Sequence, residues 1–343
     1  MSSEELFEQR HRRNIAKYQQ QVWLILEKAD KDIAAQLAIY KAKIPNSYSE
    51  GVFFRINRSL EKKIDTILDM LQAEIGRVVQ EGIEAGWQLA NRNMDDLVKD
   101  YTAGFALSKP NFFQINTAAL QVFLNRAKAG MNLSERIWKL TKVKKYALER
   151  YLASGIYSGK SAAAISRDIR RFELNPNMLF RRVRDAEGQL HLSRSAMAYH
   201  PGQGVYRSSY KNAMRLTRTE TNIAYRTAEF YRRKELPFVT GIRVELSAAH
   251  PMSDICDAMA GEYPKGFLFT GWHPQCMCFA TSILLPKDEF VKYLDSGEVP
   301  AERYVSTIPE RAKIYLKENE ERFLKMKNAP EFMKEKAGLG KYL

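Results

Sequence analysis

The chain has 343 residues, of which 45% are hydrophobic and 27% charged, as in soluble globular proteins of two or three domains. No apolar run approaches the roughly 18 residues of a membrane span, and the charged N-terminus lacks the apolar core of a signal peptide. Three cysteines are too few for a disulfide framework, so we expect a protein of a reducing cytoplasm without a membrane partner.

The net charge of +14 comes from one segment. Residues 139–234 hold 21 Lys and Arg against 7 Asp and Glu, whereas the rest of the chain holds 33 of each sign. Such an excess is typical of a solvated surface or of a surface that binds a polyanion, and DNA is the obvious polyanion because binding phosphates releases counterions. The expected DNA-binding residues are Arg167, Arg170, Arg171, Arg181, Arg182 and Arg184.

The N-terminal third is predicted to form two long helices. Apolar residues recur three or four apart over residues 15–44 and again over 64–97, with Pro45-Asn46-Ser47 ending the first run. Helices of this kind commonly pack as an antiparallel hairpin, but they could also present their apolar faces to another chain.

The middle of the chain is predicted to be helical with irregular interruptions. Shorter helices are expected at residues 117–129, 133–153 and 161–172, an irregular stretch at 173–206, and a long helix at 206–234. Glu220 falls on the apolar stripe of the long helix, where a carboxylate needs a partner or titrates. We therefore expect Glu220 either to form a buried ion pair or to act as a catalytic acid.

The periodicity changes after Pro237. Ile242, Val244 and Leu246 alternate with charged residues, which is the pattern of a strand with one buried face, and residues 267–269 and 277–285 are also strand-like. A charged helix is expected at 309–327. The predicted fold class is therefore mainly α with a small β-containing C-terminal module, an α+β arrangement.

All cysteines of the chain lie in that module, within a 23-residue stretch. Thiolate and imidazole are the ligands that Zn²⁺ prefers, and a tetrahedral site needs four from separate segments. We expect a Zn²⁺ site made by Cys256, His273, Cys276 and Cys278, with His250 or Asp254 as substitutes. Cys276 and Cys278 could share an ion only if the backbone bends between them. The alternative is a small core of buried free thiols.

Catalytic interpretations fit these residues less well. A nucleophilic Cys256 with His250 or His273 lacks a recognisable orienting group. A zinc deaminase would need H-x-E and P-C-x-x-C, where this chain has H-P-M and P-Q-C-M-C. An E-x-E triplet like that of ADP-ribosyltransferases occurs at Glu318 and Glu320, but it lies in the charged tail helix, where such triplets are common.

Three stretches in this order resemble one known family. They are L-S-E-R-I-W leading to S-G-I-Y-S-G-K-S (133–161), L-T-R-T-E-T-N-I-A-Y-R (216–226), and D-I-C-D…G…H-P-Q-C-M-C (254–278). Together they are similar to the phage Mu protein F-like head morphogenesis family, the minor head proteins of tailed double-stranded DNA phages and prophages. The resemblance covers about residues 130–285.

The resemblance implies a minor capsid protein incorporated into the procapsid, with portal and capsid or scaffold proteins and packaged DNA as partners. The matching positions are Arg218, Glu220, Asn222, Asp254, Cys256, Gly261, His273, Pro274, Cys276 and Cys278. Many relatives carry a second cysteine three residues after the first, where this chain has Met259. A site of four cysteines is therefore impossible here.

The combined expectation is a non-enzymatic protein of the phage head, present in the host cytoplasm during assembly and afterwards in the virion. We expect a long-helix region at 1–110, a head morphogenesis domain at 111–285 with its Cys/His module at 238–285, and a charged helical tail at 286–343. One alternative is a prophage enzyme or toxin carrier, nuclease or ADP-ribosyltransferase-like, that uses Glu220 or Cys256. Another is a prophage DNA-binding protein without a role in the virion.

Overall fold

The computed structural model describes residues 3–42, 50–105, 117–126, 132–142, 144, 182–184, 187, 190–192, 209–247, 254–273, 276–325, 331–333 and 339. The chain forms two compact units. The first comprises residues 1–16, 81–125 and 218–343, and the second comprises residues 17–80 and 126–217. The domain boundaries expected after residues 110 and 285 stay predictions.

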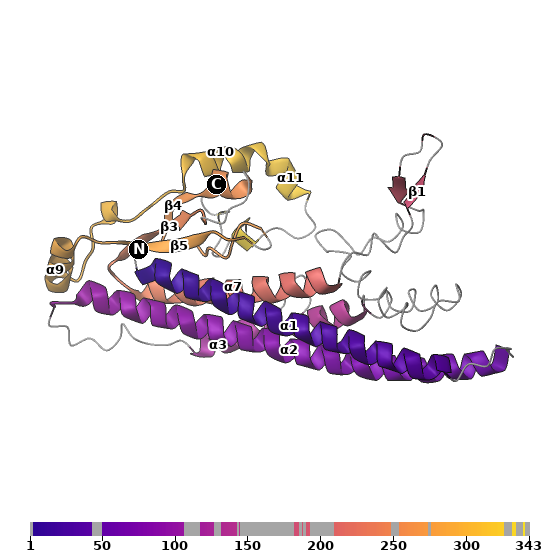
Figure 1. The fold of residues 1–343 in the computed structure, drawn as a ribbon. Helices are drawn as coiled ribbons and strands as arrows, with labels where there is room; N and C mark the ends of the chain where they lie inside the picture. Colours follow the sequence, from indigo (N-terminus) through magenta and orange to yellow (C-terminus); the bar gives the residue numbers. More distant parts are fainter. Residues whose placement is uncertain are drawn as a thin grey trace. The chain divides into compact units, whose positions relative to one another are not determined.

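Two long helices open the chain, as the sequence predicts. Helix α1 covers Ser3–Ala42 and helix α2 covers Glu50–Thr102, and the two run antiparallel (Figure 1). In the second unit their apolar stripes are buried, with Val22 and Ile33 of α1 fully covered and Ile75 of α2 almost so. An ion pair from Lys28 Nζ to Glu74 Oε1 (3.8 Å) joins the helices there. None of the described helices combines the length and the apolar character of a membrane span.

The described parts of the middle segment agree in part with expectation. Helix α3 covers Thr117–Leu124, residues 133–142 are helical, and helix α7 covers Ser209–Glu235. The predicted helix at 161–172 lies outside the described residues. The expectation of irregular structure over 173–206 is wrong at one place, because β1 (Arg182–Arg184) pairs antiparallel with β2 (Leu190–Leu192).

The first unit contains a three-stranded antiparallel sheet in the order β4-β3-β5. Its strands are β3 (Val239–Glu245), β4 (Gly261–Pro264) and β5 (Phe279–Leu284). The register places Val244 of β3 opposite Gly261 on one side and Ala280 on the other. Ile242 and Val244 are buried while Arg243 between them is exposed, which confirms the period-2 interpretation.

The strand expected at 267–269 is wrong. The backbone turns after β4, where the Phe267 amide donates to the Pro264 carbonyl (2.9 Å), and the following residues form no strand. Their apolar character has another cause, because Phe267 and Phe269 pack against the ring of Trp272 in the core. Buried aromatic residues need apolar neighbours but not a ladder of backbone hydrogen bonds, so composition alone mislabels them.

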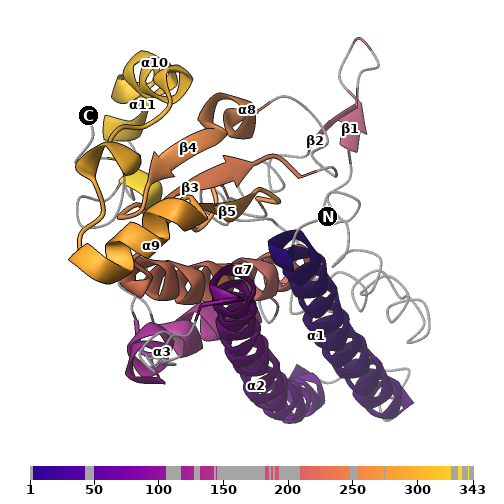
Figure 2. The ribbon, with the colours of Figure 1, turned by 90° about the vertical axis from the view of Figure 1, so that its left-hand side faces the viewer.

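Short helices cover the sheet in the first unit (Figure 2). Helix α8 (Ile255–Met259) and helix α10 (Glu310–Glu318) contribute Met259, Ala312 and Leu316 to the core beneath β3 and β5. Helix α9 (Lys287–Ser296), which the sequence interpretation did not predict, packs Phe290 against Tyr101 of α2 and Phe238. The predicted tail helix at 309–327 is interrupted at Asn319, where α10 gives way to α11 (Glu320–Leu324). Single 3-10 turns occupy Ala301–Arg303 and Glu331–Met333.

The fold class is thus confirmed: the described chain is mostly helical, with a small antiparallel sheet in its C-terminal region.

Candidate metal centre

The N-terminus of α8 positions the first cysteine. Asp254 is the N-cap of this helix, and its Oδ1 accepts a hydrogen bond from the amide of Cys256 (2.6 Å). Asp257 Oδ2 accepts a hydrogen bond from the amide of Asp254 (2.8 Å), which completes a capping box. This local sequence fixes the first turn of the helix and orients the buried Cys256 side chain toward the loop that precedes β5.

That loop supplies the other sulfur atoms. Gly271 has φ +105°, a conformation that favours glycine, and a Cβ there would lie 3.1 Å from Cys276 Cβ. Two residues later the carbonyl of His273 accepts a hydrogen bond from the amide of Cys276 (3.1 Å). The backbone between Cys276 and Cys278 belongs to no strand, because β5 begins at Phe279. The bend that a shared ion requires is therefore available.

Three buried cysteines converge at this point and could hold a metal ion. Their Sγ atoms all lie within 4.8 Å of one another, and those of Cys256 and Cys276 are 3.7 Å apart. Zn–S bonds of about 2.3 Å in a tetrahedron place two sulfur ligands about 3.8 Å apart. The sulfur separation thus suits tetrahedral Zn²⁺. The expectation that Cys256 meets the 273–278 segment in space is confirmed.

The fourth ligand of a tetrahedral site is less clearly placed than the three cysteines. His273 Nε2 lies 3.2 Å from Cys256 Sγ and 3.3 Å from Asp254 Oδ2, so Asp254, Cys256 and His273 make a second close group that shares Cys256 with the first. The side chain of His273 is 35% exposed, so this group lies at the surface side of the buried sulfurs. Asp254 is then placed to orient the imidazole, as carboxylates beside metal-binding histidines commonly do. His250, the other proposed substitute, and Pro274 lie outside the described residues.

The pKa values of Cys276 and Cys256 are shifted in opposite directions. Hydrogen bonds with Cys256 and then Cys278 lower the pKa of Cys276, and the backbone amides of Trp272 and Cys278 act in the same direction. Hydrogen bonds with Cys276 and Cys278, together with burial, raise the pKa of Cys256. A lowered pKa favours the thiolate, which is the form of cysteine that binds a metal ion.

The helix stretch of the family resemblance lies against this loop. Arg218 of α7 contacts the sulfur of Met277, between the two loop cysteines. Burial lowers the pKa of Arg218, and the nearby Cys276 acts in the opposite direction. Asn222, one turn further on, accepts a hydrogen bond from His11 Nε2 (3.1 Å), and Glu220 is buried. These positions therefore belong to the packed interior of the first unit.

Two further positions of the resemblance also have structural surroundings. Gly261 opens β4 at φ +142°, and a Cβ there would lie 2.6 Å from Cγ of Pro309. Met259, which replaces the second cysteine of many relatives, is fully buried in the core around the sheet. Both residues contribute packing next to the sulfur cluster.

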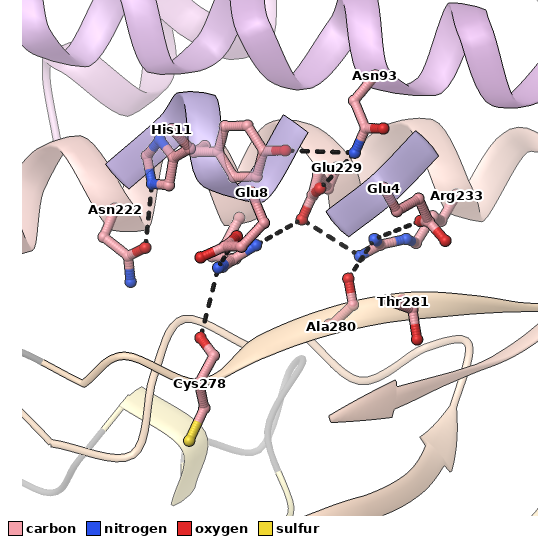
Figure 3. Close-up of polar contacts among 12 residues, drawn as sticks. Glu4, Glu8, His11, Asn93, Asn222, Glu229, Arg233, Cys278, Ala280 and Thr281 are labelled. Atoms are coloured by element: carbon pink, nitrogen blue, oxygen red, sulfur yellow. Dashed lines mark hydrogen bonds and ion pairs between the residues drawn. The ribbon is translucent and has the colours of Figure 1, made fainter. Parts of the chain in front are cut away.

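A network of buried charges reaches the backbone of Cys278, one of the three clustered cysteines (Figure 3). Arg226 of α7 pairs with Glu8 of α1 (Nη2 to Oε2, 2.6 Å) and with Glu229 (Nη1 to Oε2, 3.3 Å). Arg233 pairs with Glu4 (3.1 Å) and with the same Glu229 oxygen (3.4 Å). Burial alone would lower the pKa of Arg226, but the attraction of Glu8 and Glu229 outweighs it and raises the pKa.

The same charged side chains occupy the outer edge of β5, the strand nearest to α7 (Figure 2). The carbonyl of Cys278 accepts from Arg226 (3.4 Å) and the carbonyl of Ala280 accepts from Arg233 (2.8 Å). The amide of Ser282 donates to Glu4 (2.9 Å). Alternate residues of an edge strand point their backbone groups outward, and here Ala280 and Ser282 of β5, with Cys278 just before it, find charged partners.

These contacts show that some of the positive charges of residues 139–234 are paired inside the protein. Arg226 and Arg233 are neutralised by Glu8 and Glu4 from the N-terminus, and Arg232 pairs with Asp95 (2.6 Å). In the second unit, Lys144 Nζ lies 2.6 Å from Asp30 Oδ1 with both side chains 1% exposed, and Tyr210 donates to Oδ2 of the same carboxylate (2.6 Å). Part of the local excess is therefore internal charge pairing and not a surface for phosphates.

The structure describes only two of the proposed DNA-binding residues. Arg182 and Arg184 lie in β1, and Arg167, Arg170, Arg171 and Arg181 lie outside the described residues. Their role stays a prediction.

Sequence reasoning missed the N-terminal carboxylates and His11. A usable signal was present, since Arg226, Glu229 and Arg233 recur on one face of α7, and Glu4 and Glu8 recur four apart on α1. Charged residues in stripes of both helices indicate that the stripes face each other. The separation of more than 200 residues between the partners concealed that match.

No protein-family model, curated protein or solved structure matches this chain.

Proposed function

We propose that this chain is a minor capsid protein of a tailed phage or prophage, which acts in head assembly by binding and not by catalysis. The observation that carries the proposal is the meeting of two of the three stretches that carry the family resemblance, 216–226 and 254–278. Arg218 of the helix stretch lies against Met277 of the cysteine stretch, and within the latter Cys256 of α8 meets Cys276 and Cys278 of the loop before β5. They make one packed centre, as parts of a single structural module would.

Within this proposal the centre is a structural Zn²⁺ site. Cys256, Cys276 and Cys278 would bind the ion, and His273, or Asp254 in its place, would supply the fourth ligand. Zinc bound this way stabilises the fold and leaves no position for a reacting water. The buried positions of Glu220 and Cys256 are in keeping with structural roles for both residues.

The partners follow from the same proposal. The long helices would dock on portal, capsid or scaffold subunits, and the arginines of residues 167–184 would face packaged DNA. Contact with phosphates would make DNA affinity fall steeply with salt, in proportion to the number of phosphates neutralised. The protein would reside in the host cytoplasm during assembly and in the phage head afterwards.

Particle composition tests the proposal directly. Mass spectrometry of purified phage particles should find the chain together with portal and major capsid proteins, in far fewer copies than the latter. Metal analysis of the purified protein should find one zinc per chain. Absence of the chain from particles would overturn the virion role, and nuclease or ADP-ribosyltransferase turnover lost in Glu220→Gln or Cys256→Ser would establish the enzymatic alternative.

A further inference from the structure

Two arginines from different helices bind the backbone that carries the loop cysteines. Arg12 of α1 donates from Nη2 to the carbonyl of Met277 (3.3 Å), and Arg226 of α7 donates from Nη2 to the carbonyl of Cys278 (3.4 Å). These carbonyls follow each other in the chain, and Cys276 and Cys278 flank Met277. The two hydrogen bonds therefore act on the peptide units that decide where the two sulfurs point.

One carboxylate anchors both arginines. Glu8 accepts from Arg12 Nε at Oε1 (3.1 Å) and from Arg226 Nη2 at Oε2 (2.6 Å). The Glu8 side chain is 7% exposed and that of Arg226 is 2% exposed, so the bond between these two forms away from bulk water, where charge-assisted hydrogen bonds are strong. The start of α1 is in this way tied to the cysteine loop through Glu8 and Arg12.

From this arrangement we infer that Arg12, Arg226 and Glu8 are positioning residues of the metal centre, and that metal binding and docking of the first three turns of α1 stabilise each other. The inference rests on the proposed zinc site. A bound ion fixes the bend at Met277 and with it the two carbonyls, which favours the docked helix. By linkage, the docked helix raises the metal affinity by the same factor. Outer partners of this kind typically contribute about 10- to 100-fold in metal affinity.

Zinc affinity of the full-length protein, measured by competition with a chromophoric chelator, tests the inference. Arg12→Gln removes the bond to Met277 and leaves the Arg226 pair with Glu8 in place, and the Arg12 side chain is 29% exposed, so the variant is expected to fold. We expect its zinc affinity to fall about 10-fold or more. Arg13→Gln is the matched control, because Arg13 is the exposed next residue of the same helix, and its zinc affinity should equal that of the parent.

A second readout examines the helix and does not depend on affinity. Hydrogen exchange of the amides of residues 3–12 should be slower in the zinc-loaded parent than after chelation. Arg12→Gln should reduce this difference, and Arg13→Gln should leave it unchanged. If the parent binds zinc while Arg12→Gln shows unchanged affinity and exchange, the inference is wrong and the proposed zinc site stands. If the parent binds no zinc, both are wrong.

Discussion

Glu4 and Ser282 are 278 positions apart in the chain, yet the amide of Ser282 donates to the Glu4 carboxylate at 2.9 Å. The hydroxyl of Ser282 donates to the same carboxylate at 2.9 Å. The first turn of the protein thus closes the edge of its C-terminal sheet. An uncovered edge strand is a template for pairing with another chain, and this contact removes that template.

The buried charge network should be far more sensitive to mutation than an exposed ion pair. Arg226→Met leaves Glu8 without its buried partner, so we expect the free energy of unfolding to fall by about 3–5 kcal/mol. Glu8→Leu combined with Arg226→Met should cost less than the sum of the single changes, because the buried Glu8 charge that lost Arg226 is removed with it. Denaturant titration measures all three variants.

An exposed pair in the same unit is the matched control. Arg243 and Glu262 lie 2.7 Å apart with side chains 57% and 50% exposed. Arg243→Met should cost at most about 1 kcal/mol. Equal losses for Arg226→Met and Arg243→Met would contradict the structural importance assigned to the network.

Zinc should stabilise the parent but not a variant that lacks one sulfur. Free zinc at 100 times the dissociation constant adds about 2.7 kcal/mol to the free energy of unfolding when only the folded state binds it. Cys276→Ser, with Cys256→Ser as its counterpart, should have a lower melting temperature than the parent and no response to zinc. Glu302→Ser, an exposed change in the same unit, should retain the response. Melting curves of Cys276→Ser that match those of the parent with and without zinc would exclude a structural site.

Acid should destabilise the protein through His11. Burial, and then the positive charge of Arg226, lower the pKa of His11 well below 6.5, while its hydrogen bond with Asn222 raises it and the nearby Arg12 and Arg218 lower it further. Below pH 6.5 the unfolded chain therefore binds a proton that the folded protein does not. Stability decreases as the pH falls, by up to about 1.4 kcal/mol per pH unit.

The measurement is the free energy of unfolding from pH 7 to pH 5 in the parent and in His11→Gln. Glutamine can still donate to Asn222 but does not titrate, so its curve should be flatter than that of the parent. Parallel curves would show that His11 does not change its protonation on unfolding.

Gly261 should be intolerant of a methyl group for two reasons that can be separated. Its φ of +142° strains any L side chain, and the added Cβ would meet Pro309 at 2.6 Å. Gly104 has φ +93° and no atom within 4 Å of its Cβ position, so Gly104→Ala reports strain alone. We expect Gly261→Ala to lower the free energy of unfolding by about 1–3 kcal/mol and by more than Gly104→Ala. A smaller loss for Gly261→Ala would mean that Pro309 moves aside without cost.

The fold class could be predicted from the sequence because it depends on local periodicity. Apolar spacings of three and four gave α1, α2 and α7, and alternation gave β3, since each reports which face of an element is buried. The prediction failed at 267–269, where aromatic residues serve packing and not pairing. It also failed to predict α9, a helix of ten residues whose apolar side chains are confined to residues 290–294.

The candidate site could be predicted only in part. The few cysteines and histidines of the chain limited the possible ligands. A metal ion needs ligands from separate segments, so the meeting of Cys256 with Cys276 and Cys278 could be predicted. The distance of His273 from the other two sulfurs and the orienting position of Asp254 depend on how the loop folds. No spacing rule supplies that information.

By itself the sequence determined the long helices α1, α2 and α7, the kinds of ligand that the cysteine stretch offers, and the segment where positive charge accumulates. Only the tertiary structure decided which of these positive charges are paired with carboxylates inside the protein. Arg226 and Arg233 read as surface cations until Glu8 and Glu4 are seen to neutralise them. The physical reason is that periodicity is a local property of the chain, whereas the partner of a buried charge is fixed by packing between segments that lie far apart in it.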